Sequence, residues 1–260
     1  MKIIAVANQT GGVGKTTTTA HLAWGLAKKG KRVLVVDFDP QGNLSSGMGA
    51  LTGAEQATVL EWLGLGASPA EFSATVRHSS GVDILPANIY LDSGELLLYR
   101  QLGRERCLDK RLKPLRGRYD YVLIDCRPSL GLLTINALTA ADEVLVPMRA
   151  DFYSIPAVEQ LIVSIKEIRE NCNPRLKYNG FLITMLDKRR NTEDYIANFA
   201  DLAESVKTKL YSAQIRLNAA AADVPSYSMS LYEYKPTSNA AADYAAFTEE
   251  FLQREESGNA

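Results

Sequence analysis

The chain has 260 residues, of which 46% are hydrophobic and 23% are charged, and its formal net charge at pH 7 is −1. These values are typical of a soluble globular protein, and the length allows one large α/β domain with a sizeable core. The small net charge excludes nucleic-acid binding driven by overall charge, so any such binding needs a local basic patch.

The three cysteines indicate a reducing compartment. Cys107, Cys126 and Cys172 show neither metal-site spacing nor a pairing pattern. The sequence opens in an apolar segment without a signal peptide, and no apolar run approaches the roughly 18 residues that span a bilayer. We therefore expect a cytoplasmic protein.

The first predicted strand, residues 2–7, leads through a glycine-rich loop into a helix from Thr16 to Lys29. In this arrangement, backbone N–H groups and the helix N-terminus face a polyphosphate. Lys15 would reach the β- and γ-phosphates, and the Thr16 hydroxyl would ligate Mg²⁺. The predicted phosphate-binding residues are Gly11, Gly12, Val13, Gly14, Lys15, Thr16 and Thr17.

Carboxylates follow two later strands. The strand at 32–38 carries Asp37 near its end, and Asp39 follows it, with Pro40 and Gly42 forming a turn. Asp37, nearer the strand end, would lie close to Mg²⁺. The alternative is a capped turn in which Asp39 bonds backbone amides.

The strand at 121–125 ends in Asp125, and a carboxylate at the end of an apolar strand is typical of a residue that holds Mg²⁺, directly or through water. The alternative is an ordinary aspartate that caps a turn.

The remaining pattern also alternates strands with helices. Further strands are predicted at 82–86, 143–147 and 178–185, and helices at 104–113, 132–140, 155–170 and 192–209. This alternation predicts an α/β fold: a mostly parallel, twisted sheet with helices on both faces.

The three motifs, in this order, resemble those of ParA/MinD-family ATPases, whose deviant Walker A loop reads K-G-G-x-G-K-[ST]. The likeness is strong over residues 1–165 and weaker to about 250; residues 37–43 match D-x-D-P-Q-G-N, and residues 124–131 match I-D-C-P-P-S-L-G except at Arg127. The resemblance implies a P-loop NTPase fold in a single domain over residues 1–253, with a disordered tail at 254–260.

The short, Soj-like ParA proteins are the most similar branch. Longer relatives carry a helix-turn-helix before the first strand, and this sequence begins at that strand. MinD relatives end in a basic amphipathic membrane helix, whereas this sequence ends in an acidic stretch, so no membrane partner is expected.

The resemblance implies a function as well. The protein would bind ATP and Mg²⁺, with Asp39 orienting or activating the attacking water and Lys15 assisting. It would form a homodimer on ATP, bind DNA non-specifically on the nucleoid, and be released when a ParB-like adaptor stimulates hydrolysis, so positioning a plasmid, chromosome region or other cargo. Two alternatives stay open: an ATP-binding scaffold with little hydrolysis, and a metabolic P-loop enzyme of related fold.

One departure concerns the lysine that opens the family's loop, which reaches the partner subunit's phosphates in relatives. Thr10 stands in its place. Three interpretations follow: another cation replaces it, with Arg127 and Arg149 as candidates; the ATP-bound protein fails to close; or Thr10 is an engineered substitution.

Basic residues that could contact DNA fall into two sets. The first is Lys188, Arg189, Arg190, Lys207, Lys209, Arg216 and Lys235. The second, denser set is Arg104, Arg106, Lys110, Arg111, Lys113, Arg116 and Arg118, for which a solvated helix face is the alternative. Four alanines at 219–222 stand where relatives often carry basic residues, so weak DNA binding is expected.

Overall fold

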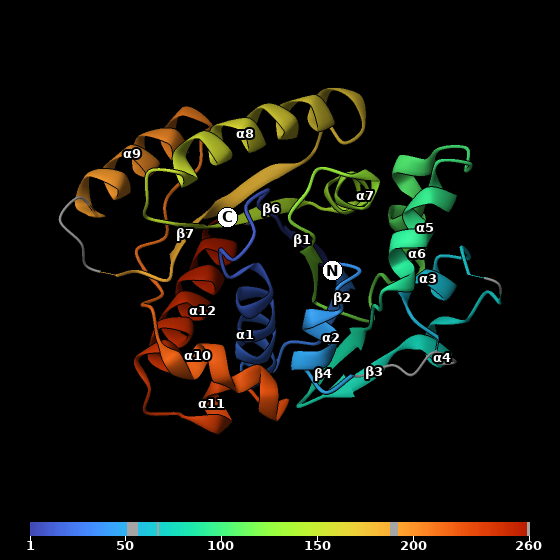
Figure 1. The fold of residues 1–260 in the computed structure, drawn as a ribbon, viewed down its shortest axis with the longest axis horizontal. Helices are drawn as coiled ribbons and strands as arrows, with labels where there is room; N and C mark the ends of the chain where they lie inside the picture. The colour runs from blue at the N-terminus through green and yellow to red at the C-terminus, as the bar shows by residue number, and fades with distance from the viewer. Residues whose placement is uncertain (51–56, 67, 188–191, 259–260) are drawn as a thin grey trace.

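A seven-stranded sheet forms the centre of the computed structural model, which describes residues 1–50, 57–66, 68–187 and 192–258 (Figure 1). The strand order is β3-β4-β2-β5-β1-β6-β7. The strands are β1 Lys2–Val6, β2 Val33–Phe38, β3 Arg77–Ser79, β4 Val82–Leu85, β5 Tyr121–Cys126, β6 Glu143–Arg149 and β7 Lys177–Thr184. Six strands run parallel, and β3 pairs antiparallel with β4 at one edge.

Helices cover both faces of the sheet. In Figure 1, α7, α8 and α9 lie above the sheet, and α1 and α12 lie below it. The longer helices are α1 Lys15–Lys28, α5 Tyr90–Leu98, α7 Leu132–Ala140, α8 Ser154–Asn171, α9 Thr192–Ser205 and α12 Asn239–Gly258. The shorter ones are α2 Asn43–Gly47, α3 Val59–Trp62, α4 Phe72–Thr75, α6 Cys107–Leu112, α10 Ala219–Asp223 and α11 Leu231–Tyr234, with 3₁₀ turns η1 Arg104–Arg106, η2 Lys113–Leu115 and η3 Val224–Tyr227.

The apolar strands follow from burial on both faces. In β1, Ile3 and Ala5 join one hydrophobic core, and Ile4 and Val6 join the other. Because successive side chains of a strand point to opposite faces, a sheet covered on both sides needs continuous apolar runs. The predicted mostly parallel α/β sheet is confirmed.

The six predicted strands are all present, and the three-residue β3 was not predicted because its sequence, Arg-His-Ser, carries no apolar signal. The predicted helix at 104–113 is divided into η1, α6 and η2, and the one at 192–209 ends at Ser205. The prediction of a disordered tail from residue 254 is wrong up to Gly258, and a domain boundary at 253 would cut α12. Glu255 is buried there beside Lys2, at 2.8 Å.

His21 connects α1 to the C-terminal helices. Its Nε2 accepts a hydrogen bond from the Leu231 N–H at 3.1 Å, so its Nδ1 carries the proton and donates to the Thr17 carbonyl at 2.8 Å. The ring stacks on Tyr244 with centroids 4.9 Å apart. Complete burial lowers the pKa of His21 to about 4, so the imidazole is neutral at pH 7.

The sheet brings the carboxyl ends of β1, β2 and β5 to one edge. In register, Asp125 of β5 pairs with Val6 of β1 on one side and with Asp37 of β2 on the other. The predicted phosphate loop and both predicted strand-end carboxylates therefore lie together. Within the described residues, we find no helix with the length and apolarity to cross a bilayer.

Candidate active site

The glycine-rich loop between β1 and α1 depends on left-handed backbone at two positions. Gly12 has φ +70° and Gly14 has φ +75°, a region that side-chain-bearing residues rarely adopt. Thr184, the last residue of β7, donates its hydroxyl hydrogen to the Val13 carbonyl at 2.8 Å, and the same oxygen lies 3.1 Å from the Met148 carbonyl. The loop is thus attached to the strands beyond it.

Lys15 lies inside the curve of this loop. Its side chain is buried, with the residue only 6% exposed, and its Nζ donates to the Thr10 carbonyl at 2.8 Å. Burial lowers the pKa of Lys15, while the nearby Asp125 opposes that shift. A buried ammonium at the end of a glycine-rich loop, where a helix begins, is arranged to meet an anion.

Thr16 and Asp125 form the next contact. The Thr16 hydroxyl donates to Asp125 Oδ2 at 2.7 Å, and the Thr19 hydroxyl lies 3.4 Å from Oδ1. Burial, and then the neighbouring Asp37, raise the pKa of Asp125 to about 8. A buried carboxylate with too little positive charge nearby, beside a hydroxyl oxygen, is a donor set that fits Mg²⁺.

The structure limits how many protein ligands such a metal would have. Among the described residues, no group of three or more His, Cys, Asp or Glu side chains could hold a metal ion. Mg²⁺ is commonly held by one or two protein oxygens, with phosphates and water completing its shell. The arrangement here agrees with that pattern.

Asp37 is fully engaged by its own loop. Its Oδ2 accepts from the Ser45 N–H at 2.8 Å and from the Ser45 hydroxyl at 2.6 Å, and its Oδ1 accepts from the Asp39 N–H at 3.2 Å. Ser45 Oγ in turn accepts from the Ala87 N–H at 2.9 Å. Burial raises the pKa of Asp37 to about 6. Asp37 thus anchors the loop that carries Asp39, and its metal role stays a prediction.

Asp39 faces the cavity that the loop encloses. Its Oδ1 accepts from the Gln41 N–H at 3.0 Å, as in the predicted capped turn, and the other oxygen makes no hydrogen bond within the described part of the chain. The cavity has a volume of about 550 Å³ and is lined by Asp39, Lys15, Thr16 and the loop glycines, and also by Pro128 and Met185. Every predicted phosphate-binding residue except the buried Val13 contributes to it.

Arg127 is held away from the cavity by α5. Its guanidinium lies 2.6 Å from Glu95 Oε2 and 3.3 Å from Asp92 Oδ1. Glu95 Oε1 also accepts from the Leu133 N–H at the start of α7. Because two carboxylates already neutralise it, Arg127 fits poorly as a replacement for the missing lysine.

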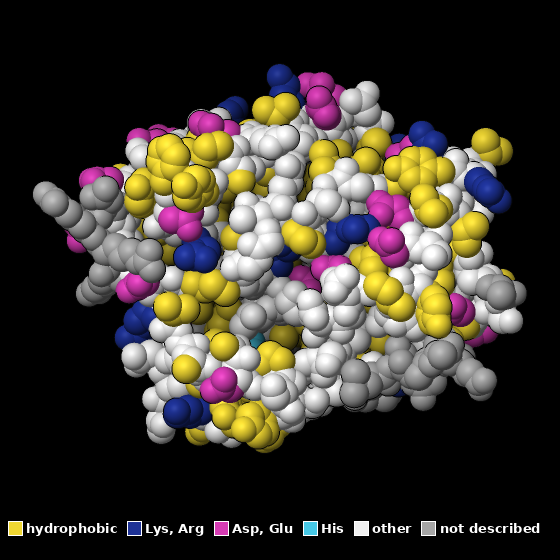
Figure 2. Space-filling view, in the orientation of Figure 1, with side chains coloured by type: hydrophobic (Ala, Val, Ile, Leu, Met, Phe, Trp, Pro, Cys, Tyr) yellow, Lys and Arg dark blue, Asp and Glu magenta, His cyan; other side chains and the backbone are white. Residues whose placement is uncertain are grey.

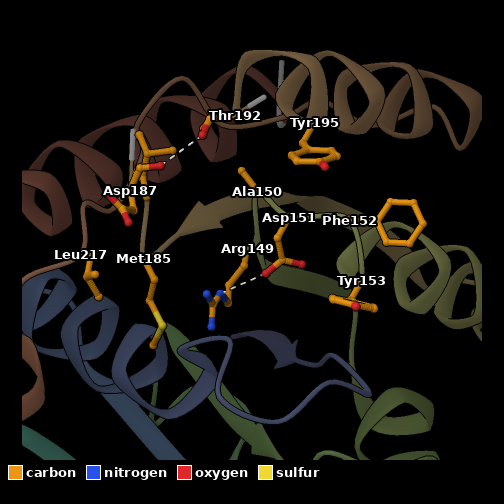
Figure 3. A pocket seen from close by; sticks show the side chains of 11 residues that line it. Arg149, Ala150, Asp151, Phe152, Tyr153, Met185, Asp187, Thr192, Tyr195 and Leu217 are labelled. Carbon is orange, nitrogen blue, oxygen red and sulfur yellow. Dashed lines mark hydrogen bonds and ion pairs between the residues drawn. The ribbon is translucent and has the colours of Figure 1, made fainter. Parts of the chain in front are cut away.

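Arg149 is more available. Its partner in the structure is Asp151 at 3.2 Å, and 44% of its side chain is exposed. Figure 3 shows the guanidinium pointing toward the blue N-terminal segment, at the floor of a second cavity of about 770 Å³. Met185 lines both cavities, so the two adjoin.

The predicted DNA-contacting residues differ in how far nearby acidic side chains neutralise their charge. Arg216 is bound by Asp243, with the closest contact 2.5 Å, so its charge is largely neutralised. Lys207 and Lys209 border a groove that also contains Glu249 and Glu250. The four alanines begin α10. Lys188, Arg189 and Arg190 lie outside the described residues.

Sequence reasoning missed three residues of the site. Ser45 anchors Asp37, Thr184 anchors the loop, and Met185 lines both cavities with a left-handed φ of +50°. Ser45 lies eight residues after Asp37, just beyond the second motif, whereas Thr184 lies 171 residues after Val13, and no local pattern marks so long-range a hydrogen bond.

Comparisons with known proteins agree with this geometry. The AAA domain family model matches residues 1–178. The chain is 37% identical over 257 residues to the chromosome partitioning protein ParA of Caulobacter vibrioides, covering 98% of this chain and 95% of that protein. It is 38% identical over 251 residues to the sporulation initiation inhibitor protein Soj of Bacillus subtilis, covering 96% and 97%.

A solved structure has the same fold over almost the whole chain. Cobyrinic acid a,c-diamide synthase from Mycobacterium smegmatis, with bound ADP and magnesium, superposes with a TM-score of 0.84 and 35% identity, covering 99% of this chain and 96% of that one. Taken with the loop, the strand-end carboxylates and the sheet order, these matches show that the chain belongs to the ParA/MinD family of P-loop ATPases.

Proposed function

We propose that this protein is a ParA-type partition ATPase of the deviant Walker A class, which binds and hydrolyses Mg·ATP. One observation carries the proposal: Lys15, Thr16 and Asp39 line one glycine-walled cavity, and the Thr16 hydroxyl is hydrogen-bonded to the buried Asp125. A cation, a carboxylate and a hydroxyl–carboxylate pair that can hold a metal are the components that phosphoryl transfer needs.

The cofactors are ATP and Mg²⁺. The synthase structure that shares 35% identity contains ADP and magnesium, which supports this assignment. The loop amides and Lys15 would hold the phosphates, and Thr16 and Asp125 the metal, with Asp37 nearby. When bound there, Mg²⁺ would supply positive charge that offsets the negative charge of the phosphates.

Hydrolysis is assigned to Asp39. Its carboxylate lies on the cavity wall, is partly exposed, and has one oxygen available beyond the turn. It would orient a water for in-line attack on the γ-phosphate or accept its proton. Lys15 would stabilise the charge that develops on the transferred group.

The cycle of dimerisation, DNA binding and release is proposed by analogy with the family. The protein would dimerise on ATP, bind nucleoid DNA without sequence preference, and leave it when a ParB-like adaptor stimulates hydrolysis, thereby positioning a plasmid, chromosome region or other cargo. Because Thr10 carries no charge, Arg149 is the candidate cation at the dimer face.

A steady-state ATPase assay with and without non-specific DNA tests this function. We expect Mg²⁺-dependent turnover that DNA together with an adaptor stimulates, and none for Lys15→Ala. ATP binding without turnover under any of these conditions would favour the scaffold alternative instead.

A second candidate is a metabolic synthase, favoured by the likeness to cobyrinic acid a,c-diamide synthase over 99% of this chain. The same assay with cobyrinic acid in place of DNA separates the two. Turnover that depends on cobyrinic acid and ignores DNA would replace the partition proposal.

A further inference from the structure

The outer side of α5 and the turn after it form an exposed hydrophobic surface. Leu96 is 69% exposed and Leu102 is 96% exposed, and Ile89 and Tyr99 are also more than half exposed. We call these four residues the α5 patch. Leu96 and Tyr99 are three residues apart, so they share one side of the helix. Clustered large apolar side chains on a protein surface commonly mark an interaction site.

The α5 patch is bordered by positive charge. The Arg104 guanidinium lies over the Tyr99 ring, 5.5 Å from its centroid. Lys110 Nζ reaches over the turn to within 3.6 Å of where a Cβ on Gly103 would lie. Arg100 is exposed in the same turn. In Figure 2, hydrophobic side chains gather at the upper right, over α5, with Lys and Arg side chains around them.

The acidic residues nearby cancel this charge only in part. Glu95 and Asp92 are both bound to Arg127, and Glu105 is bound to Arg104, whereas Arg100 and Lys110 have no acidic partner among the described residues. The exposed part of the surface is therefore apolar in the middle and basic at its rim. Its complement is a segment with aliphatic anchors flanked by Asp and Glu.

The inner side of α5 is attached to the candidate active site at two points. Arg127, two residues beyond Asp125, binds Glu95. At the other end, a Cβ on Gly42 would lie 2.9 Å from the Ala87 carbonyl, so the loop carrying Asp39 packs directly on the segment that leads into α5. A small displacement of α5 would therefore be felt by both catalytic loops.

We propose that the α5 patch is the docking surface for an acidic partner segment with aliphatic anchors, and that the Arg127–Glu95 ion pair couples docking to the nucleotide site. The second half rests on the proposed function, and the first does not. A nucleic acid fits less well. Three of the four patch residues are aliphatic and offer no ring on which a base could stack, and protein–nucleic acid interfaces are more polar.

The test begins with nucleotide-free protein and a displayed library of short random peptides. Peptides are selected on the wild type and counter-selected on the double variant Leu96→Ser/Leu102→Ser. Both leucines are exposed, so the variant keeps its fold, which circular dichroism checks. We expect the selected peptides to be acidic, with aliphatic residues at helical spacing.

A selected peptide is then synthesised and titrated. We expect about tenfold or greater loss of affinity in Leu96→Ser/Leu102→Ser and in Arg104→Glu, since central anchors dominate interfaces. Binding should weaken with salt. Matched controls on α8, Val163→Ser and Lys166→Glu, alter similarly exposed side chains elsewhere and should bind as the wild type.

Several outcomes would overturn the docking site. The selected peptides could be neutral or basic, or they could bind all variants equally. Alternatively, the patch variants could weaken only the binding of single-stranded DNA, of vesicles containing anionic lipid, or of a second copy of the chain. Coupling is tested separately: the peptide should change the affinity for a slowly hydrolysed ATP analogue in the wild type but not in Arg127→Gln. If the peptide leaves the affinity of the wild type for the ATP analogue unchanged, the coupling is disproved. If the wild type binds no ATP at all, the proposed function is disproved, but the docking site still stands on peptide binding.

Discussion

Lys15 donates its ammonium hydrogen to the backbone carbonyl of Thr10 at 2.8 Å. The residue that departs from the family's lysine thus supports the P-loop lysine through its backbone, whichever side chain it carries. The substitution changes the charge at the mouth of the loop and leaves this bond in place.

Replacing Lys15 with alanine should abolish ATP binding. The variant loses the one buried ammonium in the loop, and removing a cation from a desolvated phosphate contact costs about 2–5 kcal/mol. Isothermal calorimetry with ATP and Mg²⁺ measures this, with Lys166→Ala on the exposed side of α8 as the control. Unchanged affinity in Lys15→Ala would remove the loop from nucleotide binding.

Asp39→Ala and Asp39→Asn should both bind ATP and lose hydrolysis. Asparagine keeps an acceptor for the Gln41 N–H, so it preserves the turn while removing the carboxylate. Phosphate release measures turnover, and light scattering should show any ATP dimer accumulating. Asp201→Ala, on α9, is the control; normal turnover in Asp39→Asn would exclude a catalytic carboxylate here.

The two candidate arginines should behave differently. Arg149→Ala should shift ATP-bound protein toward monomer by about 2–5 kcal/mol, the cost of a cation lost from an interface phosphate contact. Arg127→Ala should instead lower the free energy of unfolding by about 1 kcal/mol, because its ion pairs join α5 to the loop after β5. Light scattering with a slowly hydrolysed analogue and thermal denaturation measure the two effects.

The companion variant Thr10→Lys should tighten the dimer or raise turnover. A parent that is monomeric with ATP, together with a dimeric Thr10→Lys, would mean that Thr10 disables the switch. Dimers of equal stability in the parent and in Arg149→Ala would show that Arg149 does not compensate.

The stability contributed by His21 should depend on pH. Its pKa is about 4 in the folded protein and about 6.5 when unfolded, so only the unfolded chain binds a proton between these values. Wild-type stability should therefore fall as pH decreases through this window, by about 1.4 kcal/mol per pH unit. The variant His21→Gln lacks this pH-dependent loss. Asp37 and Asp125 titrate in both proteins, so their contributions cancel in the difference between the two unfolding free energies.

Urea unfolding of both proteins at pH 7 and pH 5 measures this difference. The stability advantage of the wild type over His21→Gln should shrink by about 2 kcal/mol. A gap that stays constant would mean that His21 is already protonated or accessible in the folded protein.

The motifs were predictable because their chemistry is local. Gly14-Lys15-Thr16 follows a strand and opens a helix, and Asp125 ends a strand, so sequence neighbours alone place each group near a phosphate. Asp37 shows where this reasoning stops: its position at the strand end was right, but its engagement by Ser45 depends on how α2 folds back. Arg127 is similar, since its partners on α5 lie more than 30 residues away. The tail was mistaken because Glu255 is acidic in sequence but paired with Lys2 in space.

The position of α12 has a consequence for synthesis of the chain. This last helix covers the P-loop helix: a Cβ on Gly25 would lie 2.4 Å from the Thr248 hydroxyl, and Tyr244 stacks on His21. Residues of α12 therefore have to be synthesised before the side of α1 that carries His21 and Gly25 is covered. Until then, chaperones that recognise exposed apolar surface have access to this side of the P-loop helix.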